Sequence, residues 1–179
     1  MKNNNASGEA ALENKTVRQQ QTQSKQQTSA HAEDRSKNFD LELLDVIYKT
    51  ADMGKIALET IINKIKDIPF KNVLLSEYQS YDALTSRISV AITNENKTPR
   101  SGSSVKSSML KNTIKAKLVF NDSPSHIADM LIKGNNMGIT TINKKLNSCR
   151  EDCSKPSTDL ANDLLELQQK QIDELKIYL

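Results

Sequence analysis

The sequence is poor in the residues that build most β-sheet cores. Among its 179 residues there is no tryptophan, and phenylalanine and tyrosine together amount to only 4%. Leucine, isoleucine, valine, alanine and methionine must therefore supply nearly all of the apolar surface. Such a composition suits helices better than a β-sandwich, because sandwiches draw heavily on aromatic side chains.

Other absences exclude whole classes of function. No apolar run approaches the roughly 20 residues that a membrane-spanning helix needs, and residues 1–5 lead into no apolar signal segment. The chain is therefore expected to be cytoplasmic, without a membrane partner. It contains no glycine-rich phosphate loop, no His-x-x-x-His pair and no Gly-x-Ser-x-Gly motif. Since there are only two histidines, His31 and His126, the sequence favours a non-enzymatic protein.

The cysteines are few and the net charge is small. Cys149 and Cys153 are interpreted as free thiols in a loop, because a structural zinc site needs two further ligands. Residues 1–38 hold six Lys/Arg against four Asp/Glu, a surplus of +2, which leaves +1 of the formal +3 for residues 39–179. A nucleic-acid-binding domain concentrates more positive charge on one face. Nucleic acid, bound through the tail, is therefore the least favoured partner.

The character of the chain changes at about residue 39. Residues 1–38 contain Met1, Leu12 and Val17 as their only large apolar side chains, and residues 19–27 are glutamine-rich. We predict a disordered polar tail over 1–38, because it cannot bury enough surface to offset the entropy of ordering. A solubilising role is preferred over a role as a partner-binding arm. Residues 39–179 are predicted to form one helical domain.

Within this domain, apolar side chains recur at intervals of three and four, the period of an α-helix. The periodic stretches cover about residues 40–66, 70–93, 124–147 and 157–179. Ser123 before Pro124 is typical of a helix start. A polar linker over 94–104 is long enough to cross a bundle, and the stretch 105–120 is expected to extend or preface the third long helix after a break. We predict an all-α fold, an antiparallel four-helix bundle of ferritin-like connectivity with one extra or kinked helical segment, behind the tail.

Small residues on the apolar faces predict close approaches between helices. Ala51 and Gly54 make the middle of the first helix thin, so that a neighbouring helix can come near. Gly134 and Gly138 lie one turn apart on one face, and each costs helix propensity of about 1 kcal/mol. Close approach of another helix backbone is expected to offset that cost.

One position of the second helix departs from its apolar seam. The seam repeats at spacings of four and three, through Phe70, Leu74, Glu77, Tyr81, Leu84, Ile88 and Ala91. A buried glutamate costs stability unless it is hydrogen-bonded, and a single polar seam residue often fixes helix register. We expect Tyr78, Tyr81, a lysine or Gln168 to satisfy Glu77.

The C-terminal part of the chain resembles a known group. The run Ser125-His-Ile-Ala-Asp-Met-Leu-Ile132, the run Met137-Gly138-Ile139 and the leucines from Leu160 to Leu179 resemble uncharacterised ferritin-like four-helix bundles of low-GC Gram-positive bacteria. The first two helices match only in outline. The resemblance implies a bundle fold and long helix faces suited to self-pairing, and hence a homo-oligomer or another protein partner.

The wider ferritin-like group often binds two metal ions through glutamates and Glu-x-x-His motifs. These motifs are not intact here, because Ser80 follows Glu77 and Gln169 follows Glu166 at the histidine positions. A smaller candidate set for one iron, manganese or zinc ion consists of Glu59, Glu77, His126 and Asp129.

The sequence leaves two hypotheses. The first is a non-enzymatic helical bundle that acts through protein association, without a cofactor and with Glu77 satisfied inside the core. The alternative is a ferritin-like metal-binding or redox protein with a degenerate site. The structural role of Glu77 is preferred over the metal role.

Overall fold

A computed structural model describes residues 36–102, 104–149 and 152–179. The chain divides into two compact units after Asn38, and the candidate site belongs to the unit 39–179. The described residues are helical or lie in turns and loops, with no strand among them. The predicted tail falls outside the described residues except for 36–38, which are helical rather than disordered. No helix in the described ranges is long and apolar enough to cross a membrane.

The helices follow the predicted periodic stretches closely. A first helix covers residues 36–62, and the remaining elements are α2 (Ile68–Asn94), α3 (Ser104–Phe120), α4 (Pro124–Cys149), α5 (Lys155–Leu175) and the 3₁₀ helix η2 (Lys176–Tyr178). The first helix ends four residues earlier than the predicted Lys66, because the chain turns before Pro69.

Local chemistry explains where the helices begin. Asp67 caps α2, since its side chain accepts a hydrogen bond of 2.8 Å from the backbone N–H of Phe70. Ser123 caps α4, as predicted, with its Oγ 3.3 Å from the backbone nitrogen of His126. The break between α3 and α4 is therefore confirmed.

The predicted seams form the core. On α2, every seam position from Phe70 to Ile88 is buried, including Glu77. Leu43, Ile47 and Leu58 of the first helix are also buried, at 0%, 0% and 1% exposure. The burial of whole stripes is what stabilises helices that would be marginal in isolation.

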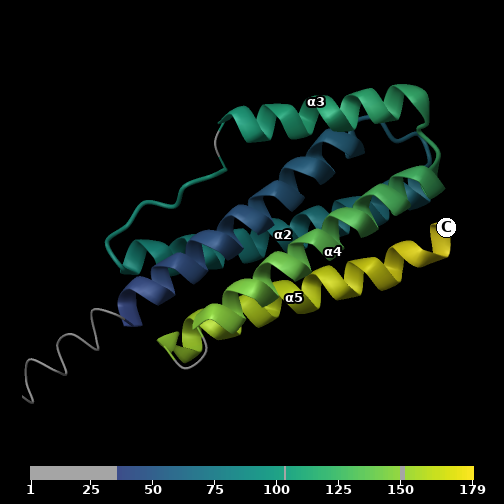
Figure 1. The fold of residues 1–179 in the computed structure, drawn as a ribbon. Helices are drawn as coiled ribbons and strands as arrows, with labels where there is room; N and C mark the ends of the chain where they lie inside the picture. The colour runs from purple at the N-terminus through teal and green to yellow at the C-terminus, as the bar shows by residue number, and fades with distance from the viewer. Residues whose placement is uncertain (1–35, 103, 150–151) are drawn as a thin grey trace, which may run out of the picture. The chain divides into compact units, whose positions relative to one another are not determined.

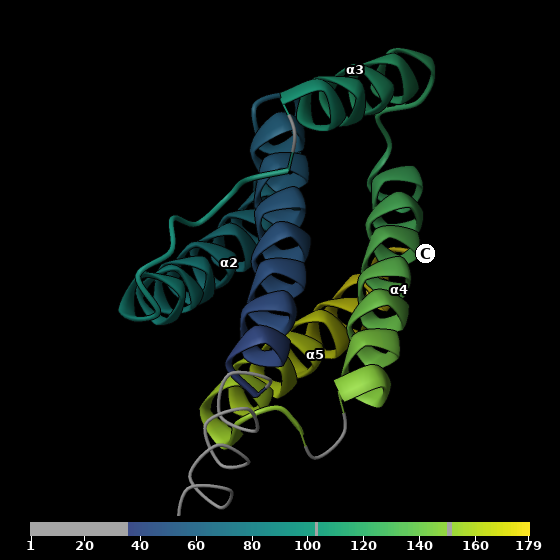
Figure 2. The same cartoon turned by 60° about the vertical axis from the view of Figure 1, so that its left-hand side comes forward.

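The segment 104–120 is the predicted extra helical segment. It forms a separate helix, α3, that crosses from the C-terminal end of the first helix to the start of α4 (Figure 2). Val105 and Met109 are exposed, at 65% and 64%, whereas Ile114 and Leu118 are buried. Leu110 is partly buried, so α3 packs against the core through Leu110, Ile114 and Leu118.

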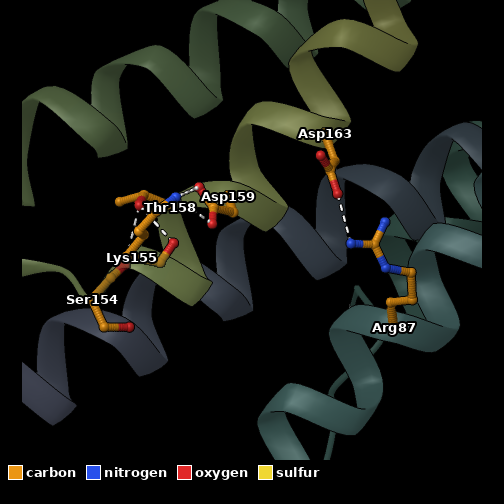
Figure 3. Close-up of polar contacts among 6 residues, drawn as sticks. All are labelled: Arg87, Ser154, Lys155, Thr158, Asp159 and Asp163. Carbon is orange, nitrogen blue, oxygen red and sulfur yellow. Dashed lines mark hydrogen bonds and ion pairs between the residues drawn. The ribbon is translucent and has the colours of Figure 1, made fainter.

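α5 packs against several of the other helices. It lies antiparallel to α4 and also contacts α2. Arg87 of α2 and Asp163 of α5 form an ion pair of 2.7 Å (Figure 3). At the start of α5, the backbone N–H of Ser154 donates to Asp40 Oδ1 of the first helix, at 2.7 Å. These contacts help to orient α5 and add little to the free energy of unfolding, because exposed ion pairs contribute about 0–1 kcal/mol.

The glycines are accommodated in different ways. A Cβ at Gly54 would lie 2.6 Å from Tyr81 Cζ, so the predicted close approach there is confirmed. A Cβ at Gly138 would lie 2.2 Å from Gln168 Nε2, whereas one at Gly134 would meet no atom within 4 Å. The predicted backbone approach at Gly134 and Gly138 was therefore wrong. Gly138 makes room for an amide side chain, and Gly134 faces open space.

Two alanine substitutions are expected to have opposite effects. Gly54→Ala should destabilise the protein by about 1–3 kcal/mol, since the fully buried Tyr81 ring cannot move aside. Gly134→Ala should stabilise it by about 0.5–1 kcal/mol, because alanine is the better helix former and meets nothing. Urea unfolding of both variants measures the two changes. Equal effects would contradict the packing described for Gly54.

Candidate functional site

A cluster of polar side chains lies inside the core. Glu77 and Tyr81 occupy successive seam positions of α2, and Gln168 and Gln171 lie one turn apart on α5. The same periodicity that buries the leucines of these helices therefore buries these four polar residues. Their exposed fractions are only 3%, 1%, 2% and 2%. Asn135 of α4 joins them and is 8% exposed.

Part of this cluster is hydrogen-bonded. The Tyr81 hydroxyl donates to Asn135 Oδ1 at 2.9 Å, and Gln168 Nε2 donates to the same hydroxyl at 3.5 Å. Three buried atoms have no hydrogen-bond partner among the described residues: Glu77 Oε1, Gln168 Oε1 and Gln171 Nε2. An unpaired buried polar group costs about 1–3 kcal/mol. Three of them on neighbouring side chains therefore require an explanation.

The cluster lines a cavity of about 770 Å³. The first helix, α2, α3, α4 and α5 all contribute to its wall, most of which is apolar. The apolar contributors include Met53, Leu58 and Ile61 of the first helix, Leu110 and Ile114 of α3, and Met130 of α4. A mainly apolar cavity of this size with a few convergent polar groups is typical of small-molecule sites.

α3 covers one side of the cavity. Ile114 and Leu118 are its buried side chains, and Lys111 Nζ lies 3.8 Å from the Glu59 carboxylate of the first helix. Few buried apolar contacts are typical of elements that open at low free-energy cost. α3 is thus the part of the cavity wall with the fewest buried apolar side chains.

The cavity disfavours an isolated negative charge. Burial, and to a lesser extent the negative charge of Glu174, raises the pKa of Glu77 from 4.5 to about 8. At neutral pH, Glu77 is therefore mostly a neutral acid. Burial also raises the pKa of Tyr81, which the hydrogen bond from Gln168 partly opposes. Tyr81 is a hydrogen-bonding group here, with its proton retained.

The four predicted metal ligands occupy different surroundings. Glu77 lines the cavity, whereas Glu59 is exposed and faces Lys111. Asp129 pairs with Lys133 at 2.6 Å on its own helix, and His126 lies half-buried at the start of α4. Across the described ranges, no group of three or more His, Cys, Asp or Glu side chains is placed to share a metal ion. The metal hypothesis stays a prediction that this geometry does not support.

Two expectations from the sequence need correction. Glu77 was expected to be satisfied by a neighbouring side chain, but its Oε1 has no partner because Tyr81 is committed to Asn135 and Gln168. Cys149 and Cys153 were expected to be free thiols, but they form a disulfide. Their Cα atoms are 5.6 Å apart, which is within the usual range for disulfide-bonded residues.

Sequence reasoning found Glu77 and Gln168 but missed Asn135 and Gln171. A signal for both exists in the spacing. Asn135 lies three residues before Gly138 and Gln171 lies three after Gln168, so each shares a helix face with a predicted core position.

No protein-family model, no curated protein and no solved structure matches this chain. The geometry of the cavity is therefore the basis for assigning it a function.

Proposed function

We propose that this protein binds a small, largely apolar molecule with a polar head group inside the cavity. The observation that carries the proposal is that Glu77, Gln168 and Gln171, which line a mostly apolar cavity, each hold a buried side-chain atom without a partner among the described residues. Proteins seldom retain such atoms unless another molecule satisfies them.

The chemistry of the wall defines two ends of the ligand. An apolar tail would be held by Leu58, Ile61 and Ile114, which remove it from water. A polar head would supply donors to the carboxyl oxygen of Glu77 and the amide oxygen of Gln168, and an acceptor to Gln171 Nε2. Water alone would serve the polar atoms but would leave the apolar wall without a favourable neighbour.

Binding of octanol tests this proposal. We expect saturable binding with one molecule per chain, measured by isothermal titration calorimetry. Gly134→Leu should weaken it by about tenfold or more, because Gly134 lines the cavity and faces open space that the leucine would occupy. The substitution also improves helix propensity, so the fold should be retained.

Asn136→Leu is the matched control. It places the same side chain on an exposed neighbouring position of α4 that does not line the cavity, and octanol binding should be unchanged. Octanol binding that is absent, or equally weakened in both leucine variants, would overturn the proposed function.

Two further proposals concern the fold and association. Ferritin-like connectivity is supported by the short turn before α2, the long crossover 95–103 and the antiparallel pair of α4 and α5. Association with another protein, including a second copy, is supported by exposed apolar residues at element ends: Ile68, Val119, Phe120, Ile177 and Leu179. Their side chains are 62–90% exposed.

A further inference from the structure

The surroundings of Glu77 indicate which charge the polar head group of the bound molecule carries. This inference rests on the proposed function. Each ion pair among the described residues uses a carboxylate other than that of Glu77. The charged group that acts on Glu77 is Glu174, which has the same sign and is itself 3.5 Å from Lys170. The Glu77 carboxylate therefore has no countercharge within the described part of the chain.

Two lysines, Lys49 and Lys106, also line the cavity. Lys49 forms an ion pair with Asp45, one turn away on the same helix. Neither lysine is among the charges that shift the pKa of Glu77. The two lysines therefore do not neutralise the Glu77 carboxylate.

The unpartnered atoms agree with this electrostatic asymmetry. Gln168 Oε1 is an acceptor, and Glu77 Oε1 is an acceptor whenever the carboxyl group is ionised. Both side chains are more than nine-tenths buried, Glu77 at 3% exposure and Gln168 at 2%. A head group with several donors and a positive charge would satisfy both atoms at once.

We infer that the head group is a protonated amine, so that the cavity takes an organic ammonium ion with an apolar tail. The ammonium group donates to Glu77 and Gln168 and supplies the countercharge that Glu77 lacks. Gln171 Nε2 remains as a donor and takes an oxygen next to the amine, such as a hydroxyl group. An amine with a neighbouring hydroxyl matches all three atoms.

The same arrangement disfavours a carboxylate head group. It would place a negative charge near Glu174, in a site where burial already opposes ionisation. A neutral alcohol can bind, but it gains no charge–charge interaction with Glu77. The expected order of affinity is therefore amine, alcohol, carboxylate.

Three probes with the same tail test the inference on the full-length protein: octylamine, octanol and octanoate. We expect octylamine to bind about tenfold tighter than octanol near neutral pH, and octanoate to bind about tenfold more weakly than octanol or not at all. Glu77→Gln, which keeps the size of the side chain, should abolish the advantage of octylamine over octanol. The matching amino alcohol should bind tighter than octylamine.

The outcomes separate this inference from the proposed function. Equal binding of octylamine and octanol, or preference for octanoate, overturns the amine head group and leaves the cavity as a binding site. An amine preference that survives in Glu77→Gln also overturns it, because the selectivity would then come from another group. Failure of octanol to bind overturns the proposed function itself.

Discussion

Replacement of Glu77 by glutamine is expected to remove the main pH dependence of stability between about pH 5 and about pH 8. The pKa of Glu77 is about 8 in the folded protein against 4.5 for the ordinary side chain. Between these values the folded state binds more protons than the unfolded state, so the free energy of unfolding falls as pH rises. The stabilisation that Glu77 contributes as a neutral acid is complete below pH 4.5 and is lost by about pH 8.

The expected magnitude is large for a single residue. A difference of about 3.5 pH units, at about 1.4 kcal/mol per unit, corresponds to about 5 kcal/mol at most. Urea unfolding of the wild type at about pH 5 and about pH 9 should show most of this loss. Glu77→Gln carries no ionisable group there and should be the more stable protein at alkaline pH, by a margin of several kcal/mol.

Glu166→Gln provides the control. Glu166 is exposed on α5, so removing its charge should leave the pH profile of the wild type unchanged. Parallel pH profiles for the wild type and Glu77→Gln would contradict the burial of an unpaired carboxyl group. Retaining such a group lowers stability without improving packing, which is the compromise expected of a functional site.

The fold was predictable to the extent that it depends on local periodicity. The range 70–93 was predicted for α2, which spans Ile68–Asn94, because an unbroken apolar seam and a proline in the first turn mark its limits. The orientation of α3 was not predictable in the same way. Its apolar residues repeat at helical period, but Val105 and Met109 are exposed, since the angle at which a helix meets the core is set by its neighbours.

The site shows the same limit. Glu77 and Gln168 were identified because they interrupt apolar seams. Glu59 and Asp129 have side chains suited to metal binding, yet they pair with lysines outside the cavity. A sequence specifies which residues share a face of one helix, but the rotation of each helix within the bundle decides which faces meet. The unpartnered state of Glu77 therefore becomes visible only in three dimensions.

Phe70→Ala is expected to cost about 3–5 kcal/mol of unfolding free energy, the usual loss when a large core side chain leaves a cavity. Phe70 is 0% exposed and lies in the first turn of α2, with its ring centroid 4.5 Å from that of Tyr178 in η2. Phe120→Ala removes the same atoms from a residue that is 90% exposed, and should change stability by no more than about 0.5 kcal/mol. Urea unfolding compares the two.

The pair with Tyr178 sharpens this prediction. A double-mutant cycle of Phe70→Ala and Tyr178→Ala should give a coupling energy of about 0.5–1.5 kcal/mol, as expected for aromatic rings in contact. Additive losses would mean that η2 is not held by Phe70. Neither ring lines the cavity, so the octanol affinity of the folded fraction should be the same in all three variants. Packing at this end of the core would then be separable from binding at the Glu77 cavity.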